Sequence, residues 1–241
     1  MTNPIITKPS FREVVVTTMS LGNGLTFNAQ RIGPMNFSGL RQADYSQGFR
    51  MPTMPELVPL VYASLGRKNQ AAMHVIKTLK NFWLTGNTGI LYTPKGMYAQ
   101  DNPEMVDGKI VMDENTLEDK LGKTQEKGVI FSDDRSIRFT PHGFKRGYLE
   151  LKSASDLATN SGVMVFSGGE EEAEMLAKAS EHYKSKPYFW ALAKVTHPET
   201  RFASLNSGDF GGRLGVGADG SMADNFRYSF GVKELTQGGS Q

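Results

Sequence analysis

Two runs of alternating residues inside the segment Arg201–Lys233 constrain the fold of this chain more than any other feature. Successive side chains of a β-strand point to opposite faces, so apolar residues at every second position predict a strand with one face in the core. The apolar positions are Leu214, Val216 and Ala218 in the first run and Phe226, Tyr228, Phe230 and Val232 in the second; between them lie Arg213, Gly215 and Gly217, and then Arg227, Ser229 and Gly231. We therefore expect two closing strands, and the predicted framework residues are Leu205, Leu214, Val216, Phe230 and Val232.

The same segment has an unusual composition. From Ser204 to Gly231 it contains no Lys, Glu, Gln or Trp, although these four types make up roughly a sixth of the chain and about five would be expected in such a window. Turns favour Gly, Asn, Asp and Ser, because glycine reaches positive φ and short polar side chains bond their own backbone. Adaptable recognition surfaces combine the same small polar residues with Tyr and Arg. Composition alone leaves both explanations open.

The positions between and beyond the framework residues are candidates for a contact surface. Phe210 and Tyr228 would supply apolar contact area, although alternation also places Tyr228 on the core face. Arg213 and Arg227 would be charged anchors, because the planar guanidinium can grip a carboxylate or stack on an aromatic ring. The candidates for adaptable hydrogen bonding are Asn206, Ser207, Asp209, Asp219, Ser221, Asp224 and Asn225.

Capping boxes mark two predicted helices. Thr53 and Glu56 have the spacing at which each side chain satisfies a backbone N–H of the first turn, and they predict a helix over 53–65. Ser167 and Glu170 have the same spacing and predict a helix that runs to about residue 184. Two more helices are expected over 69–84 and 115–121; the buried stripe predicted for 69–84 is Met73, Ile76, Leu79 and Trp83.

Strand patterns fill most of the remaining chain. Residues 1–12 are expected to form an extended arm, 28–50 a loop with short structure, and 236–241 a flexible tail. Residues 11–18 and 21–27 are expected to pair across the Gly22–Gly24 turn. The other predicted strands are 89–93, 97–100, 109–112, 129–131, 136–140, 147–152, 162–166 and 188–195. Because no repeat and no linker-like stretch divides the chain, we expect a single α+β domain over 1–241.

Composition argues against several classes of protein. With no cysteine, the chain has no disulfides, no thiolate zinc or iron–sulfur site and no cysteine nucleophile. A net charge of +2 gives no basic surface for nucleic acid, and the one basic cluster, around Arg135, Arg138 and Arg146, is expected to be a solvated strand face. No signal-peptide pattern and no run of about 20 apolar residues occurs, so we expect a protein without membrane insertion, cytoplasmic or held at a surface through a partner.

No pattern of catalytic or metal-binding residues stands out. The histidines His74, His142, His182 and His197 lack metal-ligand spacing, and no helix is expected after the glycines of 211–217 to make a dinucleotide site. We therefore expect a non-catalytic protein with no cofactor and no metal. Two alternatives stay open. A hydrolase would use Asp133, Asp134 or His142 and needs a perturbed carboxylate facing a pocket, whereas a structural or virion assembly protein needs a large flat apolar patch.

Two motifs and the terminal composition carry a family resemblance. Residues 228–233, YSFGVK, resemble a closing strand that follows a glycine-rich variable stretch, and residues 49–56, FRMPTMPE, resemble the RLPTxxE entry to the first helix of the formylglycine-generating subgroup. The chain thereby resembles the variable proteins of diversity-generating retroelements, in their archaeal form. In these systems adenine-directed mutagenesis acts on Asn codons that keep a pyrimidine in third place, and such codons cannot become Lys, Glu, Gln, Trp or Met. Met222 departs from this rule and would be an unvaried position.

The resemblance implies a C-type lectin-like fold, with two or three helices packed on small antiparallel sheets. It also implies a rigid scaffold that presents a diversified face, within 201–233, to a protein or glycan on another cell or virus. The EPN, QPD and WND motifs of calcium-dependent sugar-binding lectins are absent, so no calcium–glycan site is implied. Formylglycine-generating oxidase activity depends on cysteines, which this chain lacks.

Overall fold

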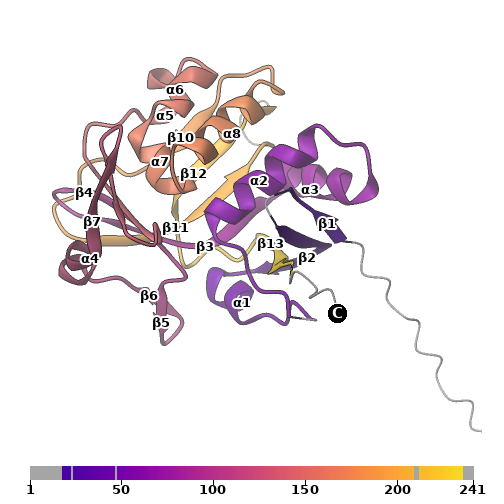
Figure 1. Ribbon diagram of the computed structural model, residues 1–241, viewed down its shortest axis with the longest axis horizontal. Coiled ribbons are helices and arrows are strands. Elements are labelled where there is room, and N and C mark those ends of the chain that lie inside the picture. The colour runs from indigo at the N-terminus through magenta and orange to yellow at the C-terminus, as the bar shows by residue number, and fades with distance from the viewer. Residues whose placement is uncertain (1–17, 23, 47, 209–211, 236–241) are drawn as a thin grey trace, which may run out of the picture.

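One branched sheet of eleven strands organises the computed structural model, which describes residues 18–22, 24–46, 48–208 and 212–235 (Figure 1). The strands of the chain are β1 (Thr18–Ser20), β2 (Leu25–Met35), β3 (Trp83–Tyr92), β4 (Gly96–Asp101), β5 (Glu104–Val106), β6 (Lys109–Val111), β7 (Leu121–Glu126), β8 (Val129–Ser132), β9 (Ile137–Pro141), β10 (Tyr188–Trp190), β11 (Glu199–Asn206), β12 (Gly215–Gly220) and β13 (Arg227–Glu234). The main path is β1-β2-β13-β3-β4-β9-β8-β7, and β11, β12 and β10 branch from β3. β5 and β6 form a separate hairpin.

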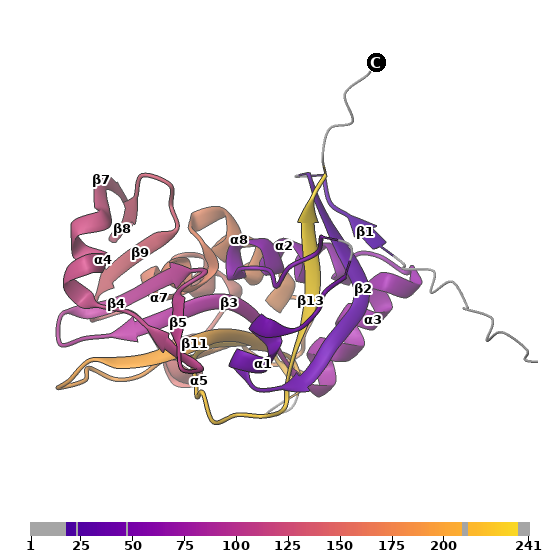
Figure 2. The same cartoon turned by 90° about the horizontal axis from the view of Figure 1, so that it is seen from below.

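Helices cover this sheet at two places. They are α1 (Phe37–Gln42), α2 (Met54–Leu65), α3 (Gln70–Asn81), α4 (Glu114–Lys120), α5 (Gly147–Glu150), α6 (Ala154–Ala158), α7 (Ser161–Ser167) and α8 (Glu170–Ser180). α5 lies beside β10 and α7 packs on β4, β8 and β9, while α3 lies beside β1 and β2 (Figure 1). Figure 2 shows β2 and β13 running side by side, across the direction of β3 and β11. The predicted α+β class is confirmed, but one large sheet replaces the several small ones expected.

The start of α2 confirms the first predicted helix. The Thr53 backbone N–H donates to Glu56 Oε2 at 2.8 Å, as the capping-box spacing predicts. Arg50 donates to the same carboxylate through Nη1 and Nη2 at 2.8 and 2.6 Å. The backbone of Arg50 also exchanges hydrogen bonds with Val232 of β13. The two motifs that carry the family resemblance are therefore neighbours in space.

Several predicted elements differ from the structure. α3 ends at Asn81 and buries Ala72, Val75 and Leu79, whereas Met73 is 57% exposed, because the buried stripe is shifted by one position from the predicted one. The predicted strand 162–166 is α7, in which the Asn160 side chain accepts hydrogen bonds from the first-turn N–H groups. Because α7 ends at Ser167, the predicted second capping box is wrong, and α8 begins after Gly169 instead.

Four further corrections concern strands and loops. Residues 147–150 form helix α5, and the strand expected over 188–195 ends at Trp190. Residues 28–50, expected to be mostly loop, hold most of β2 and all of α1. Arg138, expected on a solvated face, is 0% exposed and donates to Asp101 and to the Val165 carbonyl oxygen. The arm 1–12 and the tail 236–241 lie outside the described residues.

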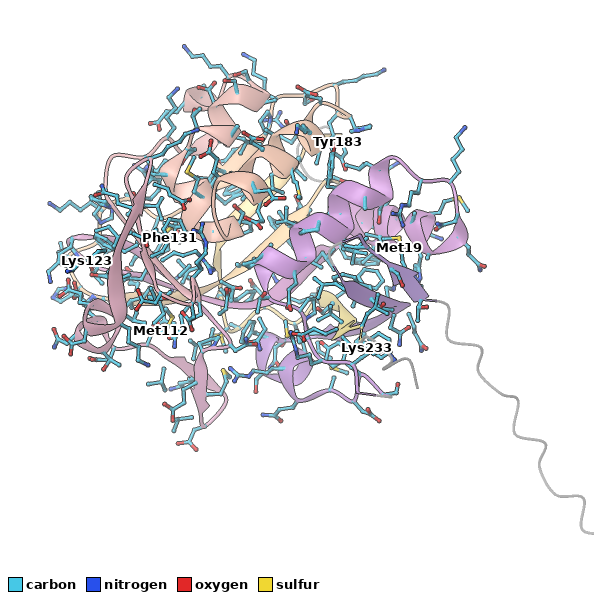
Figure 3. The ribbon with its side chains drawn as sticks, viewed as in Figure 1. Met19, Met112, Lys123, Phe131, Tyr183 and Lys233 are labelled. Carbon is cyan, nitrogen blue, oxygen red and sulfur yellow. The ribbon has the colours of Figure 1, made fainter. Side chains whose placement is uncertain are left out.

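Both faces of β13 are covered, which the alternating pattern did not predict. Phe230 and Val232 lie in the main core, as expected. Ser229, on the other face, is also buried and donates to the Thr85 carbonyl oxygen at 2.8 Å. Phe226, expected on the core face, precedes the strand and is 77% exposed. Lys233, labelled near the end of β13 in Figure 3, lies over the Phe49 ring at 4.5 Å from its centre.

Candidate functional site

A pocket of about 300 Å³ lies where β3, β10, β11 and β12 meet the loop before β13. Its walls combine two tryptophans, two carboxylates, one guanidinium and two hydroxyls, and the lining residues are Trp83, Trp190, Ser204, Asp219, Gly220, Ser221, Asp224 and Arg227. The chain contains only two tryptophans, and both line this pocket. A concave site with aromatic walls and a few convergent polar groups is typical of ligand-binding pockets.

Strand register brings these residues together. On β12, Gly217 is opposite Trp190 of β10 on one side and opposite Ser204 of β11 on the other. A Cβ atom at Gly217 would lie 2.9 Å from Trp83 Cζ3, so the missing side chain makes room for the Trp83 ring. Asp219 follows two positions later on the same strand face. The predicted alternation over 213–218 therefore places Asp219 in the pocket wall.

Arg227 holds the pocket together from the end of β13. Its Nη1 donates to Ser204 Oγ at 3.2 Å, and its Nη2 donates to Asp224 Oδ2. The guanidinium carbon lies 5.0 Å from the centre of the Trp83 ring, within range of a cation–π contact. Asp224 also accepts from the backbone N–H of Ser221, which closes the turn between β12 and β13. Arg227, expected to face solvent, is therefore a buried link between this loop and the sheet.

Asp219 is the residue of the pocket whose pKa is raised by its surroundings. Burial raises the pKa of its carboxyl, and repulsion from Asp224 acts in the same direction. Its own backbone N–H, Arg227 and Arg201 act in the opposite direction, but the net pKa is raised. A carboxylate on a pocket wall with a raised pKa is a common property of binding and catalytic sites.

The eleven predicted contact residues fall into four groups. Asp219, Ser221, Asp224 and Arg227 line the pocket, and the exposed Asn225 lies in the same loop. Arg213 is half-buried just before β12. Asn206 and Ser207, with exposed fractions of 4% and 3%, are buried, which corrects the expectation that they face solvent. Tyr228 is also buried, against Phe82. Asp209 and Phe210 lie outside the described residues.

The burial of Asn206 and Ser207 has local causes. Gly215 is opposite Asn206 on β12, and an added Cβ there would lie 2.4 Å from Asn206 Oδ1. The Ser207 backbone N–H donates to the Leu79 carbonyl oxygen at 2.7 Å, and its side chain bonds with Tyr183, which is labelled after α8 in Figure 3. Both residues thus hold the end of β11 against the helices.

The alternative hydrolase receives little support from its own residues. Asp134 accepts hydrogen bonds from Ser132 and Ser136, which lower its pKa, as in a turn-forming aspartate. His142 lines another pocket, whose wall includes neither Asp133 nor Asp134, and its Nε2 lies 2.8 Å from the Thr93 carbonyl oxygen. Among the described residues no group of three or more His, Asp or Glu side chains could hold a metal ion. None of the described helices combines the length and apolar content that crossing a bilayer requires.

Comparisons with known proteins point to one fold. No protein-family model and no curated protein matches the sequence. A solved structure described as "Accommodation of massive sequence variation in Nanoarchaeota by the C-type lectin fold" superimposes with a TM-score of 0.55, at 15% sequence identity, over 85% of this chain and 97% of its own. At that identity the likeness establishes the fold alone. The chain thus has the C-type lectin fold that its terminal motifs led us to expect.

Proposed function

We propose that this chain is a non-catalytic ligand-binding protein whose contact surface is the pocket between Trp83 and Trp190 together with the adjoining loop 221–226. The positions in and around this pocket are diversified by retroelement-directed mutagenesis. One observation carries the proposal: four of the contact residues expected from the terminal segment converge on a single pocket, beside both tryptophans of the chain. Tryptophan and arginine are the residue types that most often dominate binding surfaces.

The difference in burial between framework residues and loop residues supports the same proposal. Leu205, Leu214 and Val216 are fully buried in the main core. Ser221, Asn225 and Phe226 are exposed in the loop between β12 and β13, where substitutions remove little buried surface. A scaffold that must accept many sequences needs this separation, because the exposed loop residues can then change with little loss of stability. A fold similar to that of a protein known for massive sequence variation fits this picture.

A first experiment tests the separation in the protein. We expect the triple variant Ser221→Ala, Asn225→Ala and Phe226→Ala to melt within a few degrees of the parent, because these side chains are exposed. The single variant Phe230→Ala is the framework control and should lose about 3 to 5 kcal/mol of unfolding free energy. Differential scanning calorimetry of the three proteins decides the point. A triple variant that loses as much stability as the control would show that the loop belongs to the core and would refute the proposal.

A second experiment tests the genetic origin. The gene should lie near a reverse transcriptase gene and a near-copy of its own end, with Asn codons where this chain has varied residues. Codons of Asn and Asp always end in a pyrimidine, so only residues with a free third base are informative; these include Ser207, Gly208, Arg213, Ser221 and Arg227. Varied positions among them should carry pyrimidine-ending codons. Purines in the third place of all five codons would exclude the retroelement origin. The proposed binding surface would then still be tested by the first experiment.

A further inference from the structure

The two carboxylates of the pocket differ in their partners. Asp224 is held by Arg227 and by the backbone N–H of Ser221. Asp219 forms no ion pair and no side-chain hydrogen bond with another described residue. Arg227 and Arg201, the two arginines whose charges act on Asp219, have other partners, because Arg227 donates to Asp224 and Arg201 donates to Glu199 at 2.6 Å. Within the described part of the chain, the pocket therefore contains one carboxylate that has no ion-pair partner.

The aromatic walls of the pocket also favour a positively charged ligand. Trp83 already attracts the Arg227 guanidinium, at 5.0 Å from its ring centre. Trp190 packs against Tyr188 with ring centres 4.0 Å apart and ring planes tilted by 32°, so its ring is held in place on the pocket wall. The negative face of an indole ring attracts ammonium and guanidinium groups, and the attraction grows when water is excluded. Aromatic rings beside an unpaired carboxylate are the arrangement that binds organic cations.

Other ligand charges fit less well. An anionic group would need a cation that is free to receive it, and Arg227, the cation lining this pocket, is occupied by Asp224 and Ser204. A carboxylate ligand would also lie beside Asp219 and Asp224, and like charges at such short range repel each other. A volume of about 300 Å³ suits a single side chain or small group.

We propose that this pocket receives the ammonium or guanidinium group of a lysine or arginine side chain from a protein ligand, with Asp219 as the countercharge and Trp83 and Trp190 as the walls. The inference rests on the proposed function and names the chemistry of its ligand. Trp83 and Trp190 lie outside the segment 201–233 and would be constant from one variant to the next, whereas Asp219 lies inside it, so the inferred preference for a cation is a property of this variant.

The test uses the two tryptophans as reporters. The probes are Nα-acetyl-lysine amide and Nα-acetyl-arginine amide, with the neutral Nα-acetyl-norleucine amide, the anionic Nα-acetyl-glutamate amide and methyl glucoside for comparison. Binding of each probe is followed by the change in tryptophan emission of the full chain. We expect the two cationic probes to bind at least tenfold more tightly than the other three. Asp219→Asn should weaken them about tenfold, since it removes the countercharge and keeps the shape. Asp133→Asn, which changes the net charge equally at an exposed turn, should leave their affinity unchanged.

Each contrary outcome has a distinct meaning. A probe signal that disappears in Trp190→Phe but shows no preference for cations would overturn the cation inference and leave the binding pocket in place. Tighter binding of methyl glucoside than of the cationic probes would refute the cation inference and indicate a glycan ligand. An Asp219→Asn variant that binds the cationic probes within twofold of the parent, or a parent that responds to none of the probes, would also refute the inference. The proposed function is tested separately by the melting experiment and does not depend on these results.

Discussion

Asp219 shows at the scale of one residue how a binding site can conflict with stability. Its carboxyl is partly withdrawn from water, and burial raises its pKa above that of an exposed aspartate. The folded chain therefore holds this proton more tightly than the unfolded chain does. When the folded-state pKa is raised, stability falls as the pH increases through the window between the unfolded and the folded pKa. At neutral pH the ionised Asp219 thus lowers the stability of the folded chain. Residues that serve function often have such a cost.

This linkage gives a prediction for Asp219→Asn. The variant should melt above the parent at pH 7, because a neutral amide replaces a desolvated charge. The gain should shrink as the pH falls through the raised pKa, since the parent carboxyl then becomes neutral too. Scanning fluorimetry between pH 7 and acidic pH would measure both effects. Asp224→Asn is the matched control and should destabilise the chain, because it weakens the contact with Arg227. A gain for Asp219→Asn that is independent of pH would contradict the electrostatic explanation.

The sequence predicted some residues of the site and missed others for identifiable reasons. Asp219 was accessible to prediction because alternation along one strand places it on the face opposite Val216 and Ala218. Periodicity puts Trp83 on a helix stripe and Trp190 in a strand, and neither pattern reveals that β3 and β10 flank the terminal strands. The two tryptophans, as the only ones in the chain, were the signal that could have found them. Tryptophan is enriched where proteins bind.

At the scale of elements, the start of α2 shows why one helix was predictable. Its signal is local, because Thr53 and Glu56 lie within one turn. The signal over 162–166 was ambiguous instead, since a short apolar run fits a strand or a fully buried helix equally well. α7 is buried on every side, with Val163, Met164, Val165 and Phe166 all inaccessible. Residues 147–150 form helix α5, which local pattern likewise did not indicate.

Glu56 allows the cap and the ion pair at α2 to be separated. Burial acts to raise the pKa of Glu56, but hydrogen bonds from Arg50 and Thr53 outweigh it and lower the pKa overall. Glu56→Ala should lose about 1 to 2 kcal/mol, since the cap is lost together with the Arg50 pair. Glu56→Gln should lose less, because glutamine can also complete a capping box. Urea unfolding measures the two free energies. Equal losses would mean that the pair with Arg50, and not the cap, stabilises this helix start.

Gly217 gives a prediction that links β12 to the pocket. A methyl group there would lie 2.9 Å from the Trp83 ring and 3.3 Å from the Ser204 carbonyl oxygen, so the ring must move. Gly217→Ala should cost about 1 to 3 kcal/mol through overpacking and should also change the tryptophan emission. Gly22→Ala is the control, because nothing lies within 4 Å of an added Cβ there. An unchanged emission spectrum in Gly217→Ala would show that Trp83 does not rest on this glycine.

On the scale of the whole molecule, the buried cation Arg138 belongs to a network that ties five elements together. Arg138 of β9 donates to Asp101 of β4 at 2.6 and 3.0 Å and to the Val165 carbonyl oxygen of α7 at 2.8 Å. Asp101 also accepts from Thr88 of β3, whose hydroxyl oxygen in turn accepts from the first N–H of α2. This network joins the helices to the centre of the sheet, so the strands that carry the pocket rest on a fixed base. A composition-based interpretation placed Arg138 on the surface, because burial of an arginine depends on partners far away in sequence.

The network predicts an asymmetric response to substitution. Asp101→Ala should cost about 3 to 5 kcal/mol, because it leaves the fully buried Arg138 without its countercharge. The double variant Asp101→Leu and Arg138→Met should recover much of that loss, since an apolar pair of similar volume removes both charges. Arg135→Ala breaks the exposed pair with Glu126 and should cost no more than about 1 kcal/mol. Urea unfolding of the four proteins separates these cases. If the double variant is as unstable as Asp101→Ala, the hydrogen bonds to the Val165 and Arg135 carbonyl oxygens, and not charge pairing, hold the elements together.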